Sequence, residues 1–172
     1  MEVPVVSPIT RDLAIDGGGL TAIGVGGVVV AAALVDGGPG LAIIPFLIVA
    51  LVFGFAQVVV GGGWLRSAVA DAPPAPPGLE REDESLTVRR AGIPTLLALL
   101  LVVTTMFTWI QFAALLAGLA FAAGLTDLRS LSWIRRMQDE RDAVIVREVG
   151  PLPFATVRKS LWAVPRRAGD TS

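Results

Sequence analysis

The side chains that most often perform covalent or acid–base chemistry are scarce in this sequence. It contains no Cys, no His and no Tyr, which excludes thiolate catalysis, thiolate metal sites and the Ser–His pair of common hydrolases. No acidic side chain lies within an apolar tract: Asp16, Asp36 and Asp127 lie at tract ends, and four others cluster in the run 80–84. Consecutive carboxylates without ligand spacing are typical of a hydrated surface. We therefore expect no enzyme, no cofactor and no metal.

Glycine-rich stretches at residues 17–19 and 24–27 raise the question of phosphate binding. No Lys-Ser or Lys-Thr pair follows the first stretch, and the second does not complete a dinucleotide-binding pattern, so neither predicts a nucleotide site. The residues Gly18, Ala22 and Gly26 instead recur at every fourth position. Small residues at that spacing allow another helix backbone to approach closely, so we expect a helix-packing face here.

A second stripe of small residues, Ala114, Gly118 and Ala122, predicts another helix-packing face, flanked by further Ala and Gly residues. Gln57 is the one strongly polar side chain in its apolar segment. A lone amide in a transmembrane helix more often bonds to a neighbouring helix than lines a path for solute.

Both stripes belong to segments suited to a lipid bilayer. The chain has 172 residues, of which 53% are hydrophobic and 17% charged, well below the roughly 25% charge of soluble domains. Residues 91–126 carry no charged side chain, and about 20 apolar residues suffice for one membrane-spanning helix. This tract is too long for one span, so we expect a hairpin that turns near residues 108–111, where Thr, Trp and Gln collect.

The first half of the chain predicts a similar hairpin. Two apolar segments, residues 17–35 and 41–60, flank a Gly- and Pro-rich turn at residues 36–40. Trp64 and Arg66 follow the second segment, as is typical of side chains that anchor a helix at the membrane interface.

The predicted fold class is thus an all-α integral membrane protein with four transmembrane helices in two hairpins. The organisation is an N-terminus (1–16), hairpin 1 (17–65), a Pro-rich acidic linker (66–87), hairpin 2 (88–131) and a C-terminal tail (132–172). The composition of the linker predicts no packed structure there. The soluble parts are too short to form a separate domain with its own core.

The tail offers two alternatives. Its first part, residues 130–142, has apolar residues at helical spacing and predicts a continuation of the fourth transmembrane helix into water. Residues 154–164 predict an amphipathic helix on the membrane surface, with Arg158, Lys159 and Trp162 at the interface. The competing arrangement pairs residues 143–149 with 155–161 as a β-hairpin.

The basic residues predict the orientation in the membrane. With four spans, all 14 Lys and Arg residues lie on the side that holds both termini, which the positive-inside rule makes cytoplasmic. A three-span alternative would export the basic tail. Arg greatly outnumbers the single Lys159, a bias that favours a prokaryotic origin and hence the plasma membrane.

Two functions fit these features. The first is a non-catalytic subunit, scaffold or assembly factor that packs against the helices of other membrane proteins. The alternative is a homo-oligomeric channel or small transporter whose pore is lined by Thr, Gln or backbone groups. The expected partners are the lipid bilayer and other transmembrane helices, from the same or another protein, and not nucleic acid.

Overall fold

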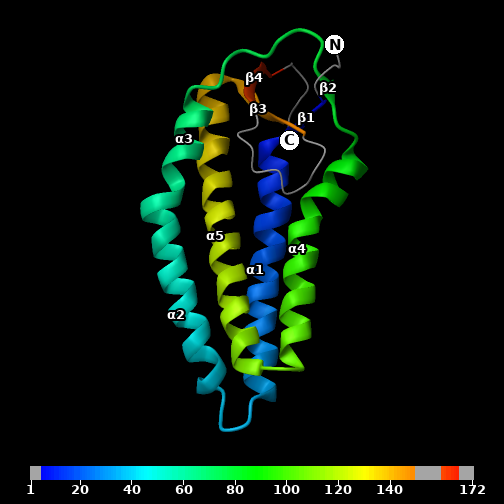
Figure 1. The fold of residues 1–172 in the computed structure, drawn as a ribbon. Coiled ribbons are helices and arrows are strands. Elements are labelled where there is room, and N and C mark those ends of the chain that lie inside the picture. Colours follow the sequence, from blue (N-terminus) through cyan, green and yellow to red (C-terminus); the bar gives the residue numbers. More distant parts are fainter. Residues whose placement is uncertain (1–4, 150–159, 167–172) are drawn as a thin grey trace.

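The computed structural model describes residues 5–149 and 160–166, apart from the side chains of residues 60–64. Four helices are long and apolar enough to cross a membrane, so the protein is a multi-pass membrane protein. A π-helix η1 continues α2 into the short helix α3, and together they form one rod (Figure 1). The helices are α1 (Ile9–Leu34), α2 (Gly40–Ala56), η1 (Gln57–Gly61), α3 (Gly62–Ala70), α4 (Glu84–Met106) and α5 (Ile110–Arg141).

A small β-sheet covers one end of the bundle (Figure 1). It has four strands in the order β2-β1-β3-β4, where β3 pairs antiparallel with both β1 and β4 while β1 and β2 run parallel. The strands are β1 (Val5–Pro8), β2 (Glu80–Arg81), β3 (Ala143–Glu148) and β4 (Leu161–Pro165). At the opposite end, residues 35–39 join α1 to α2, and residues 107–109 join α4 to α5.

Helix α5 lies between α1 and α2 and packs closely against both (Figure 1). On the α1 side, a Cβ added to Gly24 would lie 2.5 Å from the Cβ of Phe121, and one added to Gly27 would lie 2.9 Å from the Cβ of Ala117. These distances are shorter than any ordinary contact between carbon atoms. The glycines therefore let the α1 and α5 backbones approach to a separation that larger residues would prevent.

On the α2 side, the stripe Ala114, Gly118 and Ala122 is buried. A Cβ added to Gly118 would lie 2.5 Å from the carbonyl oxygen of Phe46, and one added to Gly54 would lie 3.9 Å from the Cβ of Ala122. The stripe expected to pack against another helix thus contacts α2 of the same chain.

The sheet is attached to the bundle by apolar and backbone contacts. Ile145 of β3 is fully buried and clusters with Ile9, Val69 and Ile134, which belong to three different helices. The guanidinium of Arg141, at the end of α5, donates hydrogen bonds of 3.1 and 2.7 Å to the carbonyls of Val69 and Ala70. These carbonyls end α3, where no further turn of helix can satisfy them.

For residues 161–164, the structure corrects the interfacial helix that was expected over residues 154–164. Its last part is strand β4, in which Ala163 pairs with Ile145 and Trp162 with Val146. The β-hairpin alternative agrees better with the structure, although β3 pairs with residues 161–165 instead of 155–161. Burial of the β-branched side chains of β3 selects this partner, because Ala163 and Leu161 also pack on the Ile145 cluster. Residues 150–159, which include Arg158 and Lys159, lie outside the described part.

The linker, expected to have no packed structure, also differs. Glu80–Arg81 forms β2 beside β1, and Ala75 and Pro73 exchange backbone hydrogen bonds of 3.0 and 2.8 Å with Ala163. The linker therefore pairs with the sheet on both sides. Asp83 then caps α4 by accepting a 2.8 Å hydrogen bond from the amide of Ser85, which places the start of this helix before residue 88.

We expect Gly118→Ala to lower the free energy of unfolding by about 1–3 kcal/mol, because the new methyl group would overlap the backbone of Phe46. The matched control is Gly26→Ala, since no atom lies within 4 Å of the position of its added Cβ. Unfolding of the detergent-solubilised protein by increasing SDS, followed by circular dichroism, measures both. Equal stability of the two variants would contradict the close approach of α2 and α5.

Candidate functional site

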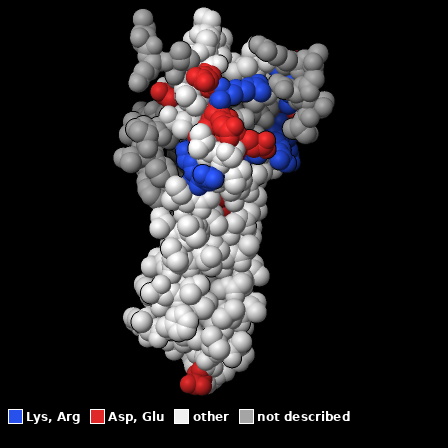
Figure 2. Space-filling model, turned by 90° about the vertical axis from the view of Figure 1, so that its right-hand side faces the viewer, with Lys and Arg blue, Asp and Glu red and all other residues white. Residues whose placement is uncertain are grey.

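Most charged side chains gather at one end of the molecule, above a stalk whose visible surface is largely uncharged down to an acidic group at its far tip (Figure 2). At the centre of this end lies an ionic cluster, which we define as Asp12, Glu82, Arg90 and Arg147. Asp12 is 3% exposed and lies in the first turn of α1, where the helix dipole favours an anion.

Arg90 of α4 donates hydrogen bonds of 3.0 and 3.2 Å to the two carboxylate oxygens of Asp12. Arg147 of β3 forms an ion pair with the same carboxylate, and the hydroxyl of Ser7 donates a 3.2 Å hydrogen bond to it. One buried carboxylate thus connects α1, α4, β1 and β3.

Glu82 completes the cluster from the linker. Arg90 donates to it at 3.0–3.3 Å, and Thr87 at 2.7 Å. Burial alone would raise the pKa of Glu82, but the hydrogen bonds from Arg90 and Thr87 hold this pKa below its ordinary value. Two carboxylates and two guanidinium groups therefore balance in charge, and every one of them has a partner. Such an arrangement can hold segments together, and it offers neither an activated nucleophile nor a base.

The described residues also contain no group of three or more His, Cys, Asp or Glu side chains able to hold a metal ion. The Gln57 side chain was predicted to bond to a neighbouring helix. Among the described residues, it forms no such hydrogen bond. It lies half-buried at the start of η1.

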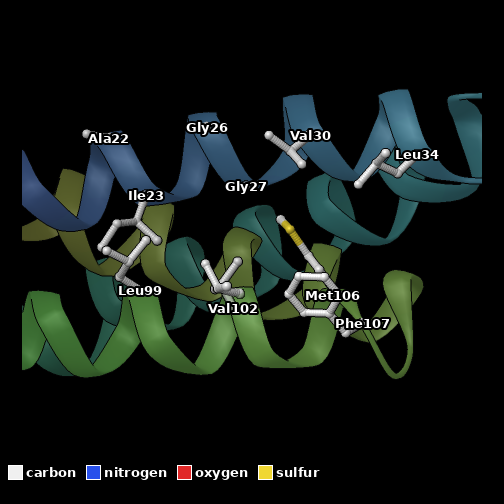
Figure 3. Close-up of a pocket in the computed structure, with 11 residues that line it drawn as sticks. Ala22, Ile23, Gly26, Gly27, Val30, Leu34, Leu99, Val102, Met106 and Phe107 are labelled. Atoms are coloured by element: carbon white, nitrogen blue, oxygen red, sulfur yellow. The ribbon is translucent and has the colours of Figure 1, made fainter.

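The second candidate site is an apolar groove between α1 and α4 with a volume of about 530 Å³. Figure 3 shows that Leu99 and Val102 extend from α4 toward α1, whereas Gly26 and Gly27 present no side chain on the facing wall. The groove opens at the surface, because Val30, Leu99 and other lining residues are more than 40% exposed. Its full lining is Ala22, Ile23, Gly26, Gly27, Val30, Leu34, Leu99, Val102, Val103, Met106 and Phe107.

The α1 stripe predicted for helix packing lies on this open side. Gly18, Ala22 and Gly26 are exposed, and the added Cβ of Gly18 or Gly26 would touch nothing. Within the chain, α1 packs through the neighbouring Gly24, Gly27 and Ala31. Contact of the exposed stripe with another protein stays a prediction.

The residues predicted from the sequence as membrane-interface anchors lie in different elements of the structure. Arg66 is exposed on α3, with its guanidinium carbon 5.9 Å from the ring centroid of Trp133 on α5. Trp162 lies half-buried in β4. Trp64 belongs to α3, but its side chain lies outside the described part, as do Arg158 and Lys159.

Sequence reasoning missed the ionic cluster. The available signal was that Asp12 and Arg90 lie beyond the same end of two apolar tracts, and four spans place these ends on one side. This restricts the possible partners of each charge but does not select the pairs. Comparison of the chain with protein-family models, with curated proteins and with solved structures finds no match.

We expect Asp12→Asn to lower the free energy of unfolding by about 3–5 kcal/mol, because it leaves two largely enclosed guanidinium groups with a single carboxylate. Glu84→Gln is the control. It removes the exposed Arg11–Glu84 pair at the same end of the bundle and should leave the stability nearly unchanged. SDS titration of both variants in detergent tests this, and equal losses would show that the ionic cluster does not stabilise the fold.

Proposed function

We propose that this protein is a non-catalytic subunit, scaffold or assembly factor of a membrane complex, and that the groove between α1 and α4 receives a transmembrane helix of another protein. The observation that carries the proposal is the stripe Gly18, Ala22 and Gly26, which lies beside the groove and is covered by nothing in the described chain. In lipid, helices associate through close packing of small residues instead of through the hydrophobic effect.

The shape and chemistry of the groove favour a helix as its occupant. Its lining side chains are all apolar, so an occupant must also be apolar at this depth. A polypeptide inside a bilayer must satisfy its own backbone hydrogen bonds, which an α-helix does. Glycines at positions 26 and 27 remove side chains from one wall and let the incoming backbone approach α1 closely.

A channel is the less favoured alternative. The groove and a second cavity of about 190 Å³ are both lined by apolar side chains, including Leu20, Phe53 and Leu116. The centre of the bundle is occupied by the close contacts of α5. A pore would therefore have to form between copies of the chain.

The proposed location is the plasma membrane, with two helix hairpins and with both termini in the cytoplasm. Most charged side chains share one end of the molecule (Figure 2), and the sheet lies at that end (Figure 1). Asp36 belongs to the loop between α1 and α2 at the other end. The described Lys and Arg side chains all lie at the end that carries the sheet, and the positive-inside rule assigns that end to the cytoplasm.

Because the chain has no Cys, single cysteines can report this orientation. Cysteine at Gly38 should react with a membrane-impermeant maleimide added to intact cells, whereas cysteine at Ser85 should react only after the cells are opened. Both positions lie outside the helical spans or at their edge, and Gly38 meets no neighbouring atom within 4 Å of its added Cβ. The reverse labelling pattern would overturn the orientation.

We expect Gly26→Leu to displace the partner helix, because the added Cβ meets no atom within 4 Å and the leucine side chain would occupy space in the groove. The tagged protein, purified from its host in mild detergent, should retain a stoichiometric membrane-protein partner that Gly26→Leu loses at least tenfold.

The matched control is Ala56→Leu, a similar enlargement at an exposed position of α2 away from the groove. It should retain the partner as the wild type does. If Gly26→Leu also retained the partner, the groove would not be the site that binds it. A symmetric self-oligomer that passes solute into liposomes would instead support the channel.

A further inference from the structure

A second surface, independent of the groove, lies around Trp133 of α5, whose half-buried side chain also packs against the cluster of Ile145. Arg129, Trp133 and Arg136 follow one another at i, i+4 and i+7 on α5, so they share one side of this helix. This side continues the stripe of Gly118 and Ala122, which faces α2. Arg66 reaches the same place from α3, with its guanidinium over the Trp133 ring.

The arginines of this surface are free to bind an external anion. Arg66, Arg129 and Arg136 are exposed and form no ion pair within the described residues. This differs from Arg90, Arg147 and Arg166, whose charges are matched by carboxylates.

The nearby acids do not fully compensate for these arginines. Asp127 of α5 faces α1, because its Cβ lies 3.1 Å from the position of a Cβ added to Gly17. Asp139, further along α5, is paired with Arg166 of the tail. Glu140 follows Arg136 by one turn on the same side of α5 and offsets one of the three arginines, so the surface around Trp133 keeps a net positive charge.

The depth of this surface matches the headgroup region of a bilayer. Arg66 follows the uncharged tract 37–65, and Arg129 is the first basic residue after the uncharged tract 91–126. Trp133 lies one turn further along α5, and long side chains on helices lean toward the helix N-terminus, which here points back into the bilayer. Tryptophan and arginine are the side chains that prefer this depth.

We propose that Arg66, Arg129, Trp133 and Arg136 form a binding site for the headgroup of an anionic phospholipid. The guanidinium groups of Arg66 and Arg129 bind the phosphate, while the Trp133 ring packs on the glycerol and the upper part of the acyl chains. Arg136, one turn beyond Trp133, adds positive charge at the outer side of the headgroup. A cation–π contact, with the Arg66 guanidinium carbon 5.9 Å from the Trp133 ring centroid, favours this position of the guanidinium before lipid arrives.

Titration of the delipidated, detergent-solubilised full chain with phosphatidylglycerol tests the site, with retained lipid counted by native mass spectrometry. The double variant R66Q/R129Q should lower the apparent affinity for phosphatidylglycerol about thirtyfold, the effect expected for two basic residues at a membrane surface. Phosphatidylcholine should bind both proteins equally weakly.

The matched control is R89Q/R135Q, which removes the same charge from two exposed arginines, one on α4 and one on a side of α5 that faces away from Trp133. It should change the affinity less than threefold. An equal loss in both double variants would show only general electrostatic attraction and overturn the site. Competition by millimolar inorganic phosphate would also overturn it, because a free anion lacks the acyl chains that the site requires. Circular dichroism melts of both variants verify that they remain folded.

Discussion

The approach of three helix backbones along α5 is the constraint on which the rest of this structure depends. In a bilayer, lipid tails are as apolar as leucine, so burying leucine side chains does not drive helices together. Residues without bulky side chains allow many weak contacts between backbones instead. Gly24 and Gly27 provide this on the α1 side of α5, and Gly118 provides it on the α2 side. The order of the helices in the bundle follows from these two faces.

The ends of the bundle are held differently, because one end meets water and contains most of the charge. There, Asp12 joins α1 to α4 and β3, and Arg90 extends the ionic cluster to Glu82 in the linker. Taking these groups out of water costs free energy, and full pairing offsets that cost. The pairing fixes how the sheet sits on the helices, since the partners come from segments far apart in the chain. At the other end, the helices are joined only by the two short turns at residues 35–39 and 107–109.

The spans could be predicted from the sequence because their signal is local. An uncharged tract as long as residues 91–126 requires a bilayer, and polar residues near its middle indicate where it turns. The stripe that includes Gly118 was equally visible as small residues at every fourth position. The helix that packs against this stripe could not be predicted, because small residues can pack against any helix with a flat face. In the structure that helix is α2 of the same chain.

The sheet and the ionic cluster could not be predicted for a related reason. Residues 143–149 were predicted as one arm of the alternative β-hairpin, but the register with β4 depends on Ile145 reaching a cluster made by three helices. The acidic linker resembled a disordered segment by composition. The Glu82 side chain is nevertheless only 7% exposed, because Arg90 neutralises it and β2 pairs with β1 beside it. Composition describes average solvation and misses a charge that has a specific partner.

The two proposed surfaces use different helices, and this has a consequence for how they would act together. The groove is formed by α1 and α4, while the site around Trp133 is formed by α3 and α5. A lipid on the second surface would therefore not displace a helix from the first. The site around Trp133 lies on α5 itself, and the groove lies on α1, which packs closely against α5. This packing leaves little freedom for the two surfaces to move relative to each other. A headgroup held by Arg66 and Arg129 would thus fix the depth of α5 in the bilayer, and with it the depth at which Gly26 meets a partner helix.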